Sequence, residues 1–329
     1  MVHKITRSGV FIWSFLMLVF VNKLTAQPLT FEKLKVSGLN LFYQPEPETK
    51  KTTVFICFPG GQGLEPALKS GLSYLTTRLM IEIPDEDKMA QVEEAGLNLR
   101  AGSTPDFSFI QLDGLNSSLG KGLKMVSETL NKPLFSGLRI EALKKIMASE
   151  ERKERTRLVN ASRLLLIRKI WPGSPAGNST YGGEADLKNI SKKDISNFYS
   201  YVLNPETMFL VVISGLKKEE VSNLISQYFS INKKTDNLAN AWKAETPAKK
   251  NESGKEYVGP RGAVVMVGFV LNGALASIYP QAFVLEKIIG EGPGCALWNL
   301  RQDKAYAYNV NSQLEIIGQK ILLLAYLET

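Results

Sequence analysis

The sequence predicts an α+β fold of two related sandwich domains, each a mixed or antiparallel sheet with helices on one face, the second of them incomplete. Three observations lead to this expectation. Apolar runs of strand length alternate with stretches of helical periodicity along the chain. A polar stretch without periodicity, residues 233–255, divides the chain in two. The part that follows repeats the strand, helix, strand order of the part before it.

Length and composition are those of an ordinary globular protein. The chain has 329 residues, of which 44% are hydrophobic and 22% are charged, which supplies enough apolar material for a sizeable core. The formal charge is +8, but the lysines are spread out and do not form a basic stripe with interleaved aromatic residues. A nucleic-acid partner is therefore not expected.

The first 26 residues resemble an export signal. Lys4 and Arg7 precede a mostly apolar run, residues 10–21, and small residues follow it. A membrane anchor is the alternative, but a run of about twelve residues is shorter than the roughly 20 residues that span a bilayer. We therefore expect a signal peptide over residues 1–26, cleavage after Ala26, and a periplasmic or secreted mature protein.

The first domain, residues 27–232, is expected to begin with strands and a helix. A hairpin around Gly38 leads into a strand, and residues 52–58 form an apolar run of strand length. Residues 67–80 predict a helix because leucines at positions 68, 72, 75 and 79 recur at spacings of three and four. The elements expected next are a helix over residues 87–95 and strands over residues 97–101 and 106–112.

Helices dominate the rest of this domain. Pro133 separates the first two of them, and Ser191 is a capping residue for the third. A charge run, residues 150–155, lies within the second and is interpreted as a solvated set of i,i+4 pairs. The elements expected in order are helices over residues 117–130, 140–170 and 191–203, a strand over residues 208–214 and a helix over residues 218–228.

Residues 233–255 are rich in Lys, Asn, Ala and Thr and are interpreted as a linker. Residues 256–329 then form a partial second domain. Its expected elements are a strand over residues 262–271, a helix over 275–289, a short helix over 295–303 and strands over 306–316 and 319–326. Because no helix follows the last strand before Thr329, we expect an uncovered apolar sheet face and a truncated chain.

Histidine and cysteine usage excludes several kinds of site. The single histidine, His3, lies within the expected signal, so a mature chain has no Ser-His-Asp or Cys-His catalysis and no His-containing zinc site. Cys57 and Cys295 could form a disulfide in an exported protein. Cys57 lies in a strand expected to be buried, however, so two buried free thiols are the favoured interpretation.

An ordered set of short stretches resembles the pitrilysin and mitochondrial processing peptidase family of zinc peptidases, which carry an inverted His-x-x-Glu-His motif. The resemblance covers the chain from about residue 30 to its end. It implies two related α+β domains joined by a linker, and two such chains facing each other around a peptide-holding chamber. The matching stretches are residues 38–41, 65–66, 71–72, 94–96, 133–135, 190–203, 208–229 and 292–308.

The resemblance places three unsuitable residues at the zinc motif. Tyr74 stands at the first His position, Thr77 at the Glu that activates water, and Arg78 at the second His. Zinc needs about three protein ligands, and Arg cannot lose its proton to become one. The family's third ligand, a more distant Glu, falls near Glu150 or Glu151. One carboxylate cannot hold zinc, so we expect no metal and no cofactor in this chain.

The resemblance also implies a second functional element. An Arg and a Tyr seven residues apart occupy the family's C-terminal domain, and this sequence has Arg301 and Tyr308 at that spacing. A phenol O–H can donate to the oxyanion of a tetrahedral intermediate, and a guanidinium can hold a peptide carbonyl. The alternative is an Arg on a solvated helix and a Tyr in a half-buried strand.

These expectations give two hypotheses about function. In the first, the chain is the non-catalytic subunit of a heterodimeric, exported zinc metallopeptidase, inactive alone, which supplies Arg301 and Tyr308 in trans to a zinc-bearing partner acting on a peptide substrate. In the second, it is a catalytically inactive scaffold or peptide-binding protein of the same fold. An autonomous enzyme of other chemistry is disfavoured, because no nucleophile–base pair or phosphate loop is apparent.

Overall fold

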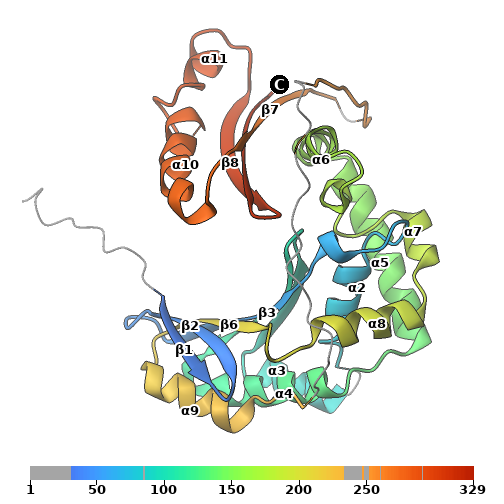
Figure 1. Ribbon diagram of the computed structural model, residues 1–329, viewed down its shortest axis with the longest axis vertical. Helices are drawn as coiled ribbons and strands as arrows, with labels where there is room; N and C mark the ends of the chain where they lie inside the picture. The colour runs from blue at the N-terminus through green and yellow to red at the C-terminus, as the bar shows by residue number, and fades with distance from the viewer. Residues whose placement is uncertain (1–30, 84–85, 233–246, 248–251, 260, 291) are drawn as a thin grey trace, which may run out of the picture.

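The computed structural model describes residues 31–83, 86–232, 247, 252–259, 261–290 and 292–329, which form two units, each built on its own sheet (Figure 1). The expected signal peptide and most of the expected linker lie outside these residues. Within the described part of the chain, no helix is both long and apolar enough to cross a membrane.

The first unit is organised around a six-stranded mixed sheet with the order β1-β2-β6-β3-β5-β4. The β2–β6 pair is parallel and the other pairs are antiparallel. Alternate side chains of the central strands are buried, including Val54, Ile56 and Ile110, as the period of two in a half-covered sheet requires. The strands are β1 (Glu32–Val36), β2 (Leu39–Pro45), β3 (Lys51–Pro59), β4 (Asn98–Ser103), β5 (Phe107–Leu115) and β6 (Phe209–Ser214).

Helices cover the buried face of this sheet, and their apolar residues join one core cluster with the strands. Short 3-10 turns, η1 (Gln62–Leu64), η2 (Asn116–Ser118) and η3 (Pro175–Gly177), connect the elements. The helices are α2 (Leu72–Leu79), α3 (Glu86–Glu94), α4 (Leu119–Asn131), α5 (Gly137–Arg155), α6 (Leu158–Ile170), α7 (Glu184–Asn189), α8 (Lys192–Val202) and α9 (Lys218–Tyr228).

The predicted start of the helix over residues 67–80 is wrong, because α2 begins at Leu72. Leu68 has a left-handed backbone (φ 62°) and a side chain that is 73% exposed, so it does not share the buried face of the helix. The carboxylate of Glu65 accepts hydrogen bonds from the N–H groups of Gly71 and Ser73. This contact satisfies donors that a helix N-terminus leaves free, and it fixes where α2 begins.

The single helix predicted over residues 140–170 is two helices, α5 and α6. At the break, the Arg157 backbone is extended (ψ 109°) and its N–H donates to the Glu154 carbonyl three residues back at 3.1 Å, so the helical hydrogen-bond pattern of α5 stops here. The charge run forms two i,i+3 pairs, Lys153 with Glu150 and Arg157 with Glu154, each at 2.7 Å, in place of the expected i,i+4 pairs. Arg152 instead pairs with Glu184 of α7 at 3.7 Å. Helix α7 had no sequence signal strong enough to predict it.

Other predictions for the first unit are confirmed. Ser191 caps α8 in a capping box with Asp194, and α9 has the predicted bounds.

Both cysteines are free thiols, as predicted. Cys57 is buried, and burial raises its pKa to about 12. Cys295 is only partly buried, so the expectation of two buried thiols is wrong for this residue.

The second unit has a three-stranded antiparallel sheet of order β7-β9-β8. Helix α10 crosses one face of β8 and β9, where the Ser312 hydroxyl donates to the Glu286 carbonyl at 2.6 Å. A Cβ added at Gly290 would lie 2.3 Å from the Ser312 nitrogen, so this close approach needs glycine. The elements are β7 (Val264–Leu271), α10 (Leu275–Gly290), α11 (Trp298–Gln302), β8 (Asn309–Ile317) and β9 (Lys320–Glu328).

The other face of this second sheet packs on α6 of the first unit. Ile167, Leu322 and Leu324 are buried in the shared apolar cluster. The Arg163 guanidinium forms two hydrogen bonds with the Glu315 carboxylate, the longer at 2.6 Å. At the turn between β8 and β9, the Gly318 N–H donates to the Asp106 carboxylate at 2.9 Å. Apolar packing and polar contacts therefore both join the two units.

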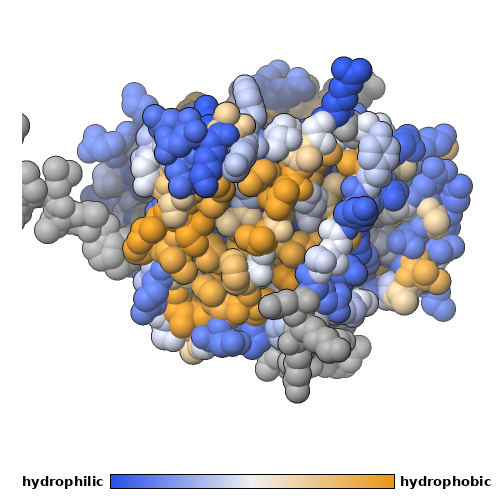
Figure 2. Space-filling view, turned by 90° about the horizontal axis from the view of Figure 1, so that it is seen from above, coloured by the Kyte–Doolittle hydropathy of each residue, from blue (hydrophilic) through white to orange (hydrophobic). Residues whose placement is uncertain are grey.

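An apolar area is visible on the upper face of the molecule (Figure 2). Residues Val265, Val267 and Phe269 lie on the face of β7 that α6 does not cover, and they are 57%, 49% and 56% exposed. Helix α10 packs against β8 and β9, not against this strand. It adds exposed apolar residues of its own, among them Val284 and Ile288.

Candidate functional site

Tyr74, at the first metal position of the family's motif, is held in an aromatic pair. Its ring meets that of Tyr181 edge-on, with centroids 5.1 Å apart. Burial, with the nearby Tyr181 phenol second, raises the pKa of Tyr74. The start of α2 and the loop before α7 approach each other closely here. A Cβ added at Gly71 would lie only 2.9 Å from the Tyr181 carbonyl oxygen. The phenol is therefore a packed and protonated group.

Thr77, at the position of the water-activating Glu, is fully buried. Its hydroxyl donates to the Ser73 carbonyl of the preceding turn at 2.8 Å. Such a bond to the helix backbone is the usual way to satisfy a Thr hydroxyl inside a helix. The side chain therefore serves the helix, and it has no basic group that could take a proton from water.

Arg78, at the second metal position, forms an ion pair. Its guanidinium lies 2.9 Å from a carboxylate oxygen of Glu82, which also lies 3.4 Å from Arg139. The Glu82 side chain is only 10% exposed, so the two cations share a nearly buried anion. This arrangement links the end of α2 to the start of α5.

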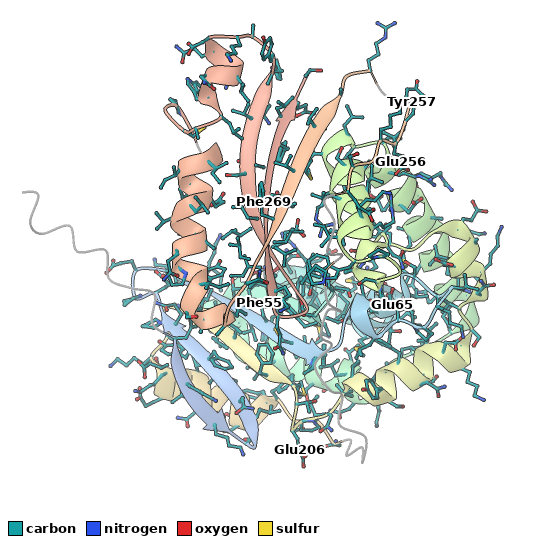
Figure 3. The ribbon with its side chains drawn as sticks, turned by 45° about the horizontal axis from the view of Figure 1, so that its top comes forward. Phe55, Glu65, Glu206, Glu256, Tyr257 and Phe269 are labelled. Carbon is teal, nitrogen blue, oxygen red and sulfur yellow. The ribbon has the colours of Figure 1, made fainter. Side chains whose placement is uncertain are left out.

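Glu65 is the strongly perturbed acid next to this helix, and its carboxylate lies at the N-terminus of α2 (Figure 3). It accepts from the Gly71 N–H at 3.1 Å, the Ser73 N–H at 2.9 Å and the Ser73 hydroxyl at 2.6 Å. Burial nevertheless raises the pKa of Glu65 to about 7. Sequence reasoning used Glu65 only as part of the family resemblance and did not identify this role.

The residues present do not fit a zinc ion. No group of three or more His, Cys, Asp or Glu side chains lies together among the described residues. Glu150 acts electrostatically on Tyr74 and raises its pKa, but its carboxylate pairs with Lys153. The side chains of Tyr74, Thr77 and Arg78 therefore do not form a zinc site with Glu150.

Arg301 and Tyr308, the other predicted pair, lie on the surface of the second unit. Arg301 is on α11, where its guanidinium carbon lies 4.9 Å from the centroid of the Trp298 ring. Tyr308 immediately precedes β8 and is 82% exposed. Its backbone N–H donates to the Glu328 carbonyl at 2.7 Å, which anchors the main chain while the phenol stays in solvent.

The structure does not bring Arg301 and Tyr308 close to the motif residues on α2. Helix α11 lies at the end of the second unit that is far from α2 (Figure 1). Neither Arg301 nor Tyr308 forms a hydrogen bond or ion pair with α2 within the described part of the chain. The alternative is met in one half: Arg301 is exposed on α11, as an Arg on a solvated helix would be, whereas Tyr308 is exposed and precedes β8, so it is not in a half-buried strand.

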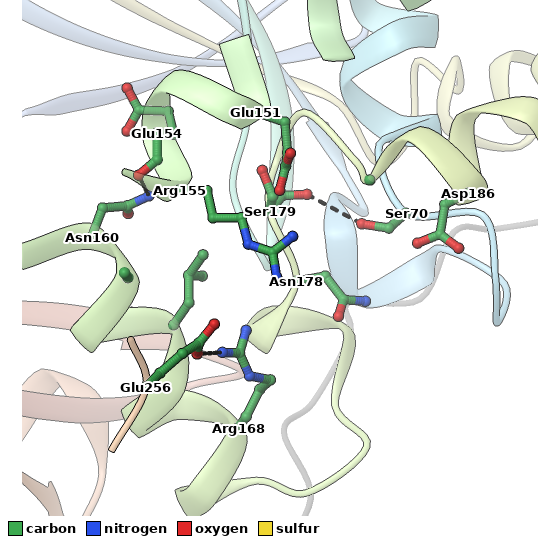
Figure 4. A pocket seen from close by; sticks show the side chains of 13 residues that line it. Ser70, Glu151, Glu154, Arg155, Asn160, Arg168, Asn178, Ser179, Asp186 and Glu256 are labelled. Atoms are coloured by element: carbon green, nitrogen blue, oxygen red, sulfur yellow. Dashed lines mark hydrogen bonds and ion pairs between the residues drawn. The ribbon is translucent and has the colours of Figure 1, made fainter. Parts of the chain in front are cut away.

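A polar cavity of about 260 Å³ lies where α5, α6 and α7 meet the segment 252–259 (Figure 4). Arg168 and Glu256 pair across part of its wall at 2.9 Å. Arg155, Glu151 and Asp186 also line it. No pattern in the sequence predicts this cavity, because its lining residues range from Ser70 to Glu256 and come together only in the folded chain.

Two regions of the chain match models of one protein family. Residues 41–184 match the model described as insulinase, peptidase family M16. Residues 189–327 match the model described as the peptidase M16 inactive domain. Together these regions include most of both sheets and all the residues of the candidate site, whereas β1 lies before the first matched residue.

A curated relative and two solved structures are similar to this chain. Cytochrome b-c1 complex subunit 1 of Bos taurus is 20% identical over 182 residues, 54% of this chain and 38% of the relative. The chain spans less than half the length of the curated relatives it matches.

A protease from Helicobacter pylori has a TM-score of 0.78 at 18% identity, covering 91% of this chain and 74% of that one. A peptidase M16 inactive domain from Pseudomonas fluorescens has a TM-score of 0.77 at 16% identity, covering 92% and 74%. These two likenesses show a shared fold. The two family matches show that the chain belongs to peptidase family M16 and contains the family's inactive domain.

Proposed function

We propose that this chain is the non-catalytic subunit of a heterodimeric, exported M16 metallopeptidase. It supplies Arg301 and Tyr308 in trans to a zinc-bearing partner chain of the same family that cleaves peptides. The observation that carries the proposal is a contrast in solvent exposure between a residue at the family's zinc motif, Thr77, and a residue of the Arg–Tyr pair, Tyr308. Thr77 is buried in its own helix, whereas Tyr308 is 82% exposed.

The two exposed side chains have distinct roles in this proposal. The Tyr308 phenol donates its O–H to the oxyanion that develops on the scissile carbonyl, which lowers the barrier of the step. The Arg301 guanidinium forms hydrogen bonds with a carbonyl of the bound peptide and holds it in register. This chain holds no zinc in the proposal, so the attacking water belongs to the partner.

A mixing experiment tests the pairing. Each purified chain alone is expected to hydrolyse a fluorogenic peptide poorly, and the mixture of this chain with a zinc-bearing M16 chain is expected to be active. Arg301→Ala in this chain is expected to raise the KM of the mixture, because the peptide loses a contact. A zinc-bearing chain that is fully active alone would contradict the proposal.

Export is part of the proposal and has its own test. The residues that support it are the positive and apolar segments before Ala26. The N-terminal sequence of the protein recovered from the periplasm or medium is expected to begin at Gln27. Recovery of the uncleaved chain from the cytoplasm would refute export without affecting the pairing.

A catalytically inactive scaffold is the second candidate. The similarity to cytochrome b-c1 complex subunit 1 favours it, since that relative is named as a subunit of a complex. This function predicts a stable complex with no peptide hydrolysis under any pairing.

A further inference from the structure

Trp298 lies under the Arg301 guanidinium on the surface of the second unit. The guanidinium carbon is 4.9 Å from the centroid of the indole ring. A cation within about 6 Å of an indole face is attracted by the negative charge of that face. The two residues are three positions apart in α11, a spacing that places side chains on the same side of a helix.

The ring beneath Arg301 is itself held in place. Trp298 is partly buried, and its indole N–H donates to the side-chain oxygen of Gln302. Arg301 is exposed, and no carboxylate within the described residues forms an ion pair with it. The indole is therefore the contact that limits where this long side chain can move.

We propose that Trp298 is a positioning residue for Arg301. The inference rests on the proposed function, in which Arg301 holds the peptide. Contact with the ring occupies one side of the guanidinium and leaves its N–H groups in the guanidinium plane free to donate to a peptide carbonyl. A side chain already held near its bound position loses less conformational freedom when the peptide arrives, so it binds more tightly.

The chain contains a matched control for this arrangement. Lys304 lies over the ring of Tyr306, with its ammonium nitrogen 5.9 Å from the ring centroid. Tyr306 is 64% exposed and comes only a few residues after α11. Tyr306→Leu therefore removes an exposed aromatic ring beneath a cation without touching the pair of Trp298 and Arg301.

The first measurement needs no partner. In the full-length chain, ring currents from the indole are expected to shift the side-chain NMR signals of Arg301 upfield. Trp298→Leu is expected to return these signals to the values of a free arginine, whereas Tyr306→Leu leaves them in place. Arg301 signals at free-arginine values in the unmodified chain would overturn the inference.

The second measurement uses the same chain mixed with a zinc-bearing M16 chain and a fluorogenic peptide. Trp298→Leu is expected to raise KM roughly two- to five-fold with kcat unchanged. This fold-change corresponds to the free energy of an exposed cation–π contact. Trp298→Phe keeps an aromatic face, so its KM is expected to stay nearer the original value. Tyr306→Leu is expected to leave both constants unchanged.

The outcomes separate the inference from the proposed function. An unchanged KM in Trp298→Leu, in a mixture that Arg301→Ala impairs, overturns the positioning role alone. A fall in kcat with no change in KM also overturns it, because that pattern indicates loss of folded protein or of another step. If Arg301→Ala is silent while the upfield shifts persist, the proposed function fails and the positioning role fails with it.

Discussion

Glu65 determines where α2 begins, and loss of its proton lowers the stability of the folded chain. Burial raises the pKa of this carboxyl from 4.5 to about 7 in the folded chain. The folded state therefore holds the proton more tightly than the unfolded state does. The resulting stabilisation is complete below the unfolded value and is lost as the pH rises through about 7.

A pH series tests this account of Glu65. The free energy of unfolding, measured with urea, is expected to fall between pH 5 and pH 8, with Glu65 contributing up to about 3 kcal/mol of the change. Glu65→Gln removes the titrating group, so the fall is expected to be smaller in this variant. An identical pH dependence in both proteins would contradict the raised pKa.

Thr77 gives a second prediction for a single residue. Its buried hydroxyl donates only within its own helix, to the Ser73 carbonyl. Thr77→Val keeps the shape of the side chain, so the free energy of unfolding is expected to change by no more than about 1 kcal/mol. Activity of the mixed pair is expected to be unchanged, as a kinetic assay would show. A large loss of kcat in a folded variant would mean that Thr77 does take part in the chemistry.

The close packing of α10 on β8 predicts that a larger side chain at Gly290 destabilises the protein. Gly290→Ala would bring a methyl group within 2.3 Å of the Ser312 backbone nitrogen, so α10 must move away from the strand. The free energy of unfolding is expected to fall by about 1–3 kcal/mol, the usual cost of overpacking. Gly137→Ala is the control, because its added Cβ meets nothing within 4 Å and alanine favours a helix. Equal stability of the two variants, measured by urea unfolding, would contradict this packing.

The sequence predicts elements best where the local signals and the final contacts agree. Helix α9 has its predicted bounds, and Ser191 caps α8 as expected. Leu68 fits the helical spacing but is exposed, because Glu65 fixes the start of α2 through bonds that no spacing reveals. Likewise, the break between α5 and α6 lies at the extended backbone of Arg157, which residue spacing within a strongly helical stretch does not reveal.

For the candidate residues, the sequence predicts which positions matter, which stays a prediction, but not the contacts that surround them. Sequence alone named Tyr74 and Arg78 as unsuitable for a metal, and the structure adds the Tyr181 ring and the Glu82 carboxylate that hold them. Those partners, like the wall of the polar cavity, come from separate parts of the chain. The contact of Trp298 with Arg301 is local, yet its geometry depends on the rotamers of two long side chains.

At the scale of the whole molecule, the two units are joined through α6. Arg163 and Glu315 form an ion pair with two hydrogen bonds across this interface, and their side chains are 24% and 16% exposed. A double-mutant cycle with Arg163→Met and Glu315→Gln is expected to give a coupling of about 0.5–3 kcal/mol in the free energy of unfolding.

The control for this cycle is a pair on the surface. Arg152 and Glu184 are 3.7 Å apart, and both side chains are 63% exposed. Solvent and salt screen such a pair, so its coupling is expected to be close to zero. A coupling between Arg163 and Glu315 as small as that of the control would mean that this pair does not stabilise the interface, which would then rest on apolar packing and the bond between Gly318 and Asp106.

In the proposed function, this chain contributes to peptide cleavage through Tyr308 and another chain's zinc. The most direct test is the kcat of the mixed pair when only this chain carries Tyr308→Phe, with partner binding measured in parallel. Loss of one donor to an oxyanion is expected to lower kcat by about 10²-fold or more, with the affinity between the chains unchanged. An unchanged kcat would contradict the claim and leave the scaffold function in its place.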